Sequence, residues 1–302
     1  MNTILTIIVT FNGARWIETC LRSLSESTLD SDILIIDNNS TDNTVDIIRS
    51  NSVDVQLIQS STNLGFGGAN NIGLLQAIKQ GYDYVFLLNQ DAYVAKDCLE
   101  KLYKSSLNSP TFGIISPIQL QPDGQNMDVV FENQVKKHYH PTTEVLLENQ
   151  TQKNIQDLHE VRFVGAASWF VTRELIKKVG LFNPFFHHYG EDNNFAARAQ
   201  YFGFKIGVQV TTSIIHDRKP RKKSDFLPVR LRTFPLHQLL DIRKPFVIAW
   251  LVGYHQLGRT SKKLRQLHGN SYNTDIEALE KWFFEDLKKA RSIRKGLKKP
   301  YL

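Results

Sequence analysis

Short apolar runs alternate with amphipathic segments through the first third of the chain, and this alternation constrains the fold more than any other feature. The apolar runs are 4–10, 33–37, 55–59 and 84–89, and the amphipathic segments that follow them are 14–25, 41–49, 68–79 and 96–107. Strands that alternate with helices indicate a mostly parallel sheet covered on both faces. In three runs, at 7–9, 33–36 and 85–88, every residue is apolar, which is typical of strands buried on both faces. We therefore predict an α/β fold with these three strands at the centre of the sheet.

Polar residues follow directly after these strands. Thr10, Phe11 and Asn12 come after the first run, residues 37–40 after the second, and residues 89–91 after the run at 84–89. In parallel α/β sheets the ligand crevice lies outside the carboxyl ends of the strands. The three clusters therefore predict a ligand site at one edge of the sheet.

The rest of the chain is less regular. Residues 119–160 are polar, contain His138, Tyr139 and His140, and are interpreted as a variable excursion over the sheet. Ordered patterns return at 161–172, 190–202 and 205–216; a basic linker at 219–223 then leads to helical patterns at 247–257 and 275–293. We predict one domain over 1–217, whose halves 1–118 and 161–217 flank the excursion, and a basic helical C-terminal extension over 218–302.

Charge is divided unevenly along the chain. Residues 1–217 hold 16 Lys and Arg against 23 Asp and Glu, whereas 218–302 hold 21 against 7. The basic tail either meets an anionic surface or presents a solvated helical face. In the first case residues 243–263, an apolar run with basic flanks, form an interfacial anchor at the inner face of a membrane. The alternative to an anchor is that these helices pack together or form a homodimer and bury Phe246, Trp250 and Leu251.

Cysteine content and hydropathy indicate the compartment. Cys20 and Cys98 fall in amphipathic segments and lack the paired spacing of a disulfide or a zinc site. The N-terminus lacks a signal-peptide pattern, and the longest apolar run, 245–254, is about half of what a membrane crossing needs. We expect a soluble cytoplasmic protein, peripheral on the membrane if the tail is an anchor, with no nucleic-acid partner.

Residues 190–192 are typical of a helix start, because a glycine precedes two acids that the helix dipole favours. At about 100° per residue, Asp192 shares a face with Phe195 and Ala199, which should pack inward. Helix capping explains Glu191 well. Asp192, a carboxylate partly withdrawn from water beside a crevice, is a candidate general base.

Two further carboxylates and one histidine are candidate ligands. Asp91 is either a turn residue or an oxygen ligand for Mg²⁺ or Mn²⁺ on a diphosphate. Asp37 either caps the next helix or accepts hydrogen bonds from a nucleobase. His216 is either structural or a metal ligand, and the second role requires Asp91 nearby.

A glycine-rich stretch at 63–73 lets the backbone approach a ligand and leads into a helix whose N-terminus attracts phosphate. It lacks the third glycine of G-x-G-x-x-G, because position 70 is Asn, and the chain contains no G-x-x-x-x-G-K-[ST]. Dinucleotide enzymes and NTPases are therefore disfavoured. Trp169, beside small residues, is either a core aromatic or a platform on which a sugar stacks.

Taken in order, six stretches resemble the family-2 inverting glycosyltransferases of the GT-A fold, most closely a rhamnosyltransferase-like branch. They are Ile8-Val9-Thr10-Phe11-Asn12, Ile36-Asp37-Asn38-Asn39-Ser40, residues 63–71, Leu88-Asn89-Gln90-Asp91, Gly165-Ala166-Ala167 and Gly190-Glu191-Asp192. The resemblance covers about 3–217 and implies a nucleotide-sugar-binding half at 1–118 and an acceptor and catalytic half at 161–217. The family's D-x-D pattern often begins with an acid, whereas this chain has Asn89 there.

The resemblance also implies roles for the candidate residues. Thr10, Asn12 and Asp37 line the nucleoside pocket, residues 63–71 border the donor, Asp91 holds a divalent cation with help from His216, and Asp192 is the base. The full set of candidate donor-binding residues is Thr10, Phe11, Asn12, Asp37, Asn63, Gly65, Gly68, Asn71, Asn89 and Gln90. Trp169 and Glu191 are the candidate acceptor-binding residues.

The leading hypothesis is transfer of rhamnose from dTDP-rhamnose, with inversion, to a hydroxyl of a bacterial surface glycan or lipid-linked glycan. Galactofuranose, galactose and glucose are alternative donor sugars. The rival from another class is a non-catalytic protein that binds nucleotide sugars or glycans, which Asn89 favours. A sugar nucleotidyltransferase is disfavoured, because residues 10–15 supply no glycine-rich basic loop.

Overall fold

The computed structural model describes residues 3–136, 157–186, 189–218 and 227–300. The chain divides into two compact units, one of residues 1–178 and 203–218 and the other of residues 179–202 and 219–302. The sequence predicted a single division near 217, but the segment 179–202 groups with the C-terminal helices. Aromatic packing accounts for this grouping, because the Phe185 ring lies edge-on to Trp282 with 5.3 Å between centroids.

The first unit is built on one mixed sheet. Its strands are β1 (Ile4–Thr10), β2 (Asp32–Asp37), β3 (Gln56–Gln59), β4 (Tyr84–Asn89), β5 (Ala92–Val94), β6 (Phe112–Leu120), β7 (Leu158–Val161), β8 (Ser168–Thr172) and β9 (Lys205–His216). They lie in the order β3-β2-β1-β4-β8-β6-β9-β5, and β7 pairs with β9 outside this path. The strands β3, β2, β1 and β4 are mutually parallel, as the alternating pattern predicts. The strand β8 runs antiparallel to β4 and β6, whereas β6 and β9 pair in parallel, so the sheet is mixed beyond β4.

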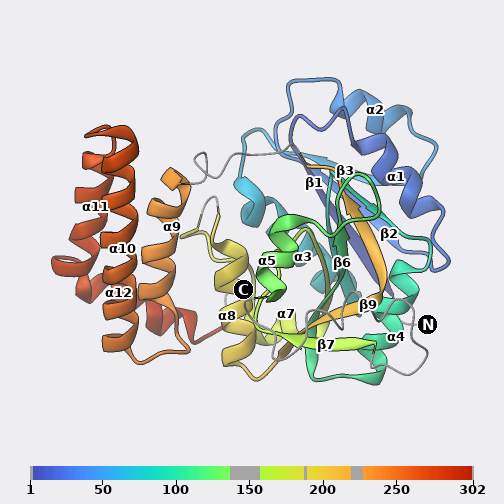
Figure 1. Cartoon of the computed structure of the whole chain (residues 1–302). Coiled ribbons are helices and arrows are strands. Elements are labelled where there is room, and N and C mark those ends of the chain that lie inside the picture. The colour runs from blue at the N-terminus through green and yellow to red at the C-terminus, as the bar shows by residue number, and fades with distance from the viewer. Residues whose placement is uncertain (1–2, 137–156, 187–188, 219–226, 301–302) are drawn as a thin grey trace. The chain divides into compact units, whose positions relative to one another are not determined.

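Helices cover both faces of this sheet (Figure 1). They are α1 (Ile17–Ser25), α2 (Thr44–Ser50), α3 (Gly65–Gln80), α4 (Cys98–Asn108), α5 (Val129–Lys136) and α7 (Arg173–Val179). On one face, Ile4 and Ile8 of β1 join a core with Leu21 of α1. The helix α3 packs so closely on β1 that a Cβ at Gly73 would lie 2.6 Å from Cδ1 of Ile7. Neighbouring residues of β1 are therefore buried on opposite faces, which explains its continuous apolar run.

The second unit is helical and has its own hydrophobic core. Its helices are α8 (Glu191–Tyr201), α9 (Leu227–Leu240), α10 (Phe246–His268), α11 (Asn273–Phe284) and α12 (Leu287–Leu297). Leu231, Leu257, Phe283 and Leu297 contribute to the core from four of these helices. The presence of a helical C-terminal region is thus confirmed.

A buried arginine ties the end of α9 to α12. The Arg294 guanidinium donates hydrogen bonds to the carbonyls of Leu239 (2.9 Å), Asp241 (2.6 Å) and Lys244 (2.5 Å). The last carbonyls of a helix have no partner within it, so a cation there satisfies both their hydrogen-bonding capacity and the helix dipole. This contact fixes the turn that leads from α9 into α10.

The helical pattern predicted over 275–293 corresponds to two helices, α11 and α12. The amides of Glu285 and Asp286 both donate to the Lys281 carbonyl at 2.8 Å, and this shared acceptor ends α11. Among the described residues, no helix is long and apolar enough to cross a membrane. Cys20 and Cys98 are buried free thiols. The residues 138–140 and the basic linker 219–223, both singled out in the sequence, lie outside the described residues.

Candidate active site

The ends of β1 and β2 bring Thr10 and Asp37 together. The two residues are partners in the parallel register, and the Thr10 hydroxyl donates to the Asp37 carboxylate at 2.9 Å. Ser40 donates to the same carboxylate through its amide (3.0 Å) and its hydroxyl (2.5 Å). Asp37 is only 1% exposed, so these donors replace water as the stabilisers of its charge. A carboxylate has about four acceptor sites, so three donors leave capacity for one further hydrogen bond.

Two asparagines shape the turns beside this carboxylate. Asn12 (φ 49°) and Asn39 (φ 69°) adopt the left-handed conformation, which asparagine tolerates better than most residues. The Asn12 side chain accepts a hydrogen bond from the Thr41 amide at 2.9 Å, and the Asn12 amide donates to the Ser40 hydroxyl at 2.9 Å. The segments after β1 and β2 therefore form one cross-braced surface.

The glycine-rich stretch is anchored to the same surface through Asn38. The side-chain nitrogen of Asn38 donates to the side-chain oxygen of Asn63 at 2.9 Å, and the side-chain oxygen of Asn38 accepts from the backbone amide of Leu64 at 2.7 Å. Asn63 also accepts from the Gly65 amide at 2.9 Å. Gly65 has φ 73°, a conformation that favours glycine, and it begins α3. Asn38 thus holds the N-terminus of α3 at the end of β2.

Gln90 connects the third polar cluster to the first. Its side chain accepts a hydrogen bond from the Phe11 amide at 3.0 Å and donates to the Phe11 carbonyl at 3.1 Å. Gly13 makes this contact possible, because a Cβ at that position would lie 2.1 Å from Oε1 of Gln90. The Phe11 ring itself is 44% exposed at the edge of the sheet and is available to a planar ligand.

Asp91 and His216 meet across the pair β5 and β9. Nε2 of His216 lies 3.4 Å from Oδ1 of Asp91 and 3.5 Å from the Asn89 side-chain nitrogen. The antiparallel register pairs Ala92 with His216, which also sets Asp217 beside Asp91. The Asp217 amide donates to the Asp91 carbonyl at 2.7 Å. The condition that the sequence set for His216, proximity to Asp91, is therefore met.

The Asp91 and His216 pair fits a divalent cation as a partial ligand set. Carboxylate oxygen and imidazole nitrogen suit Mn²⁺, and oxygen ligands suit Mg²⁺. Nε2 is the ring atom of His216 that faces Asp91. Nδ1, the other ring nitrogen, is buried and has no hydrogen-bond partner among the described residues. In the described part of the chain, no three His, Cys, Asp or Glu side chains gather at one point. Phosphate and water oxygens would have to complete the coordination.

Glu191 and Asp192 begin α8 in the second unit. Tyr189 (φ 67°) and Gly190 (φ 93°) are both left-handed, and a bulky residue in this conformation marks local strain. Oδ1 of Asp192 accepts from the Asn193 amide at 2.7 Å and from its side chain at 2.9 Å. Glu191 is 6% exposed, and its Oε2 has no partner among the described residues. Burial, with a smaller effect of the Asp192 charge, raises the pKa of Glu191 to about 8.

This arrangement corrects the predicted orientation of α8. The sequence placed Asp192 on the buried face and explained Glu191 by capping, but Glu191 is the more buried of the two. Glu191 lies one turn before Phe195 and two turns before Arg198, both of which are buried. Asp192 lies at the border of this face and stays partly exposed.

The expectation that Trp169 stacks on an acceptor is wrong. Its ring is 0% exposed, and Nε1 donates to the Val164 carbonyl at 3.1 Å. Because the whole ring is buried, no face of it is accessible to a sugar. The structure supports the alternative interpretation of the sequence, in which Trp169 is a core aromatic residue.

The other candidate donor-binding residues lie on α3. Gly68 is in its first turn, where a Cβ would come within 3.1 Å of the Leu64 Cβ. Asn71 follows less than one turn later. Both remain predicted contacts of the donor.

Gly13 and Asp217 were not predicted from the sequence: Gly13 admits Gln90, and Asp217 accepts from the Tyr93 hydroxyl at 3.1 Å and pairs with Arg15 at 3.4 Å. Asn38 was part of the predicted cluster 37–40 but without a role of its own; it is 3% exposed and joins two loops. The contacts of Gly13 and Asn38 are distant in sequence, so no local pattern reveals them. Asp217 had a local signal, since it follows His216 directly at the end of a strand.

Two curated relatives share short stretches with the chain. An uncharacterized glycosyltransferase of Haemophilus influenzae is 40% identical over 85 residues, which cover 27% of this chain and 32% of the relative. The low-salt glycan biosynthesis hexosyltransferase Agl10 of Haloferax volcanii is 24% identical over 172 residues, 55% of this chain and 52% of Agl10. The chain thus spans about a third and about half of the length of these relatives.

Solved structures share the fold. The mannosyltransferase PcManGT of Pyrobaculum calidifontis, in complex with GDP-Man and Mn²⁺, matches with a TM-score of 0.60 and 17% identity, over 97% of this chain and 84% of its own. TarS of S. aureus, residues 1–349 with UDP, matches with a TM-score of 0.56 and 17% identity, over 89% and 74%. The chain therefore has the GT-A type of α/β fold. The family model "Glycosyl transferase family 2" matches residues 6–180, more than half of the chain, and the chain belongs to this family.

Proposed function

We propose that the chain transfers a sugar from a nucleoside-diphosphate donor to a hydroxyl group with inversion of the anomeric centre. The observation that carries this proposal is the convergence of four sequence-distant segments, 10–13, 37–41, 63–65 and 89–91, through the hydrogen bonds of Asp37, Asn38 and Gln90. These segments lie at the carboxyl ends of parallel strands and at the start of α3, where a nucleotide is expected. PcManGT and TarS, which share the fold, bind GDP-Man and UDP.

Each cluster has a distinct part in donor binding. The remaining acceptor capacity of Asp37 suits the N–H edge of a nucleobase, and the exposed Phe11 ring suits its face. Asn63 and Gly65 present the first turn of α3 to the diphosphate. Asn89 and Gln90 border the donor beside Asp91.

Asp91 and His216 would hold the divalent cation. When bound, the cation supplies the charge that stabilises the diphosphate leaving group. Asn89 cannot add a negative charge. The phosphates of the donor must therefore provide more of the negatively charged oxygen ligands than in a site with two acids. Removal of the cation is therefore expected to weaken donor binding as well as turnover.

Asp192 is proposed as the general base. Below about pH 8 Glu191 keeps its proton, which leaves Asp192 as the member of the pair that can accept a proton from an acceptor hydroxyl. The protonated Glu191, whose Oε2 has no partner among the described residues, would donate a hydrogen bond to the acceptor. Two adjacent carboxyl groups would thus have different protonation states because one is more buried.

The donor sugar is proposed from the rhamnosyltransferase-like pattern of motifs, so dTDP-rhamnose is the first donor to test. Donors of galactofuranose, galactose and glucose are the alternatives. The proposed acceptor is a glycan of the bacterial surface, free or attached to a lipid.

A transfer assay on single variants tests these roles. Asp192→Asn removes the proposed base and is expected to lower kcat at least about 100-fold with little change in donor affinity. Asp91→Ala is expected to weaken cation-dependent donor binding, measured by calorimetry. The matched control is Asp46→Asn, which neutralises an exposed carboxylate on α2 outside the site. Full activity of either test variant would contradict the assigned role.

The same measurements separate an enzyme from a binding protein. Asn89, in place of an acid, is the observation that favours a non-catalytic protein. Tight donor binding without a cation, together with no transfer to any acceptor, would establish that alternative.

We further propose that one face of α10 contacts an anionic membrane surface. Val247, Ile248 and Leu251 are exposed along its first two turns, and Arg259 and Lys263 are exposed further along the helix, on the side of Ile248. An apolar patch beside cations is the combination that binds acidic lipid surfaces. The expected anchor is narrower than 243–263, because Arg243 and Lys244 already pair with Asp241. A homodimer through this face is the alternative outcome.

A further inference from the structure

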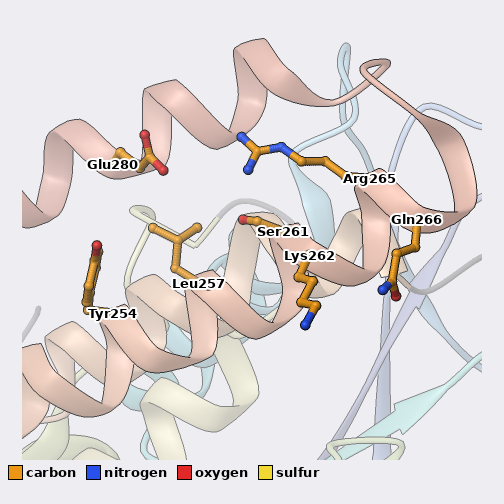
Figure 2. Close-up of a pocket in the computed structure, with 8 residues that line it drawn as sticks. Tyr254, Leu257, Ser261, Lys262, Arg265, Gln266 and Glu280 are labelled. Atoms are coloured by element: carbon orange, nitrogen blue, oxygen red, sulfur yellow. The ribbon is translucent and has the colours of Figure 1, made fainter.

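A groove lies between α10 and α11 in the second unit (Figure 2). Its volume is about 490 Å³, within the range of small-molecule sites. Tyr254, Leu257, Ser261 and Arg265 line it from α10, and Glu280 lines it from α11. The transfer reaction proposed above uses none of these side chains.

A glycine keeps the groove open. Gly258 lines it in the middle of α10, where glycine is the worst ordinary helix former. A Cβ at Gly253, also in α10, would clash with the Pro235 carbonyl at 2.8 Å, so packing explains that glycine. A Cβ at Gly258 would meet nothing within 4 Å. Packing therefore does not require glycine at 258, whereas a side chain there would occupy the groove.

One end of the groove is a rigid aromatic surface. The Tyr254 ring stacks on Trp250 with 5.5 Å between centroids and 9° between planes, and it forms a T-shaped pair with Phe284 with 5.3 Å between centroids. Tyr254 nevertheless remains 41% exposed. An aromatic ring held in this way offers a flat apolar face at little cost in side-chain entropy.

The other end is polar and carries both charges. Figure 2 shows Arg265 and Glu280 reaching toward each other from the two helices. Nε of Arg265 donates to Asn273 at 3.1 Å, which fixes the guanidinium, while Glu280 forms no ion pair with any described residue. The Ser261 hydroxyl is buried and has no hydrogen-bond partner within the described part of the chain. A donor, an acceptor and a hydroxyl thus border one space next to an apolar face.

We propose that this groove binds a sugar ring of the acceptor glycan, at a distance from the reacting hydroxyl. A pyranose ring has one apolar face that fits against Tyr254, and vicinal hydroxyls that both donate to Glu280 and accept from Arg265. Lys262 and Arg265 also line the groove, so inorganic phosphate is the competing ligand in the test below. The choice of an acceptor glycan rests on the proposed function, whereas the sugar-binding chemistry rests on the groove alone.

Saturation-transfer NMR on the full chain tests the proposal without relying on turnover. The probes are the methyl pyranosides of rhamnose, galactose, glucose and N-acetylglucosamine, each at millimolar concentration. At least one is expected to receive saturation from the protein. Gly258→Phe fills the groove and is expected to abolish the transfer, and Tyr254→Ala is expected to reduce it strongly. Glu280→Gln removes charged hydrogen bonds and is expected to weaken binding about tenfold.

Matched variants control for folding and for charge. Gly296→Phe places the same ring on α12, where a Cβ also meets nothing within 4 Å, and is expected to leave binding unchanged. Lys263→Ala removes a charge from a residue that does not line the groove, and it is also expected to leave binding unchanged. Absence of saturation for all four pyranosides, or equal saturation in Gly258→Phe and wild type, would overturn the proposal. So would displacement of the sugars by inorganic phosphate alone, which would show an anion site. Because the donor site is untouched, sugar binding that persists in an inactive Asp192→Asn variant separates this proposal from the transfer reaction.

Discussion

Replacement of Glu191 by glutamine tests whether the buried carboxyl at the start of α8 is protonated at neutral pH. Burial raises the pKa of this carboxyl from 4.5 to about 8, which corresponds to about 5 kcal/mol. Below pH 4.5 both the folded and the unfolded chain carry the proton. Between 4.5 and about 8 the unfolded chain releases the proton first, so the free energy of unfolding falls as pH rises. Above about 8 the folded chain also ionises and the loss is complete.

The variant Glu191→Gln keeps the shape of the side chain and cannot ionise. The difference in unfolding free energy between wild type and variant is therefore expected to change by about 5 kcal/mol across this window, in favour of the variant at high pH. Chemical denaturation at intervals from pH 4 to pH 9 measures the difference. Glu277→Gln, at an exposed position of α11, is the control and should run parallel to wild type.

A second variant separates the two causes of the raised pKa. Asp192→Asn removes the neighbouring charge but leaves the burial, so the Glu191 transition should move only part of the way toward 4.5. If wild type and Glu191→Gln have parallel stability profiles from pH 4 to pH 9, the carboxyl is already ionised and our assignment of Asp192 as the sole base loses its support.

Three further predictions follow from contacts elsewhere in the chain. Gly13→Ala displaces Gln90 from the Phe11 backbone and is expected to cost about 1–3 kcal/mol of stability and to weaken donor binding; the double variant with Gln90→Ala should lose less than the sum of the two, and additive losses would refute the contact. Arg294→Met removes the donor to the carbonyls of Leu239, Asp241 and Lys244, of which, among the described residues, only Asp241 accepts a further hydrogen bond, from the Lys244 amide, and is expected to cost about 3 kcal/mol in chemical denaturation, with Arg294→Lys intermediate. Leu251→Asp is expected to abolish co-sedimentation with acidic liposomes; binding that survives it, or that neutral liposomes support equally, would exclude the proposed membrane face, and a shift from dimer to monomer would identify a homodimer.

Much of the proposed donor site follows from the sequence, because the ends of parallel strands meet at one edge. Thr10 and Asp37 follow neighbouring strands, so their contact was predictable once the alternation of strands and helices was recognised. The sequence showed only that a metal-binding role of His216 would require Asp91 nearby. Whether the two residues meet depends on β5 running antiparallel to β9, which the sequence does not reveal.

Burial at the start of α8 was not predictable in the same way. Adjacent helical residues differ by only about 100°, so a small rotation of the helix exchanges which of two acids faces the core. The sequence therefore located a pair of carboxyl groups, and packing around Phe195 and Arg198 determined that Glu191 is the buried one. The burial of Trp169 was not predictable either, because a tryptophan beside small residues fits both a surface and a core position.

The sequence by itself determined the local features of this protein: the strand and helix pattern, the polar clusters that end the strands, and the basic tail. These depend on residues close together in the chain, whose periodicity and propensity are readable. Only the tertiary structure decided that 179–202 groups with the C-terminal helices, which carboxyl group is buried, and that a groove remains open at Gly258. Each of these is set by contacts between residues far apart in the chain, where no periodic pattern exists to reveal them.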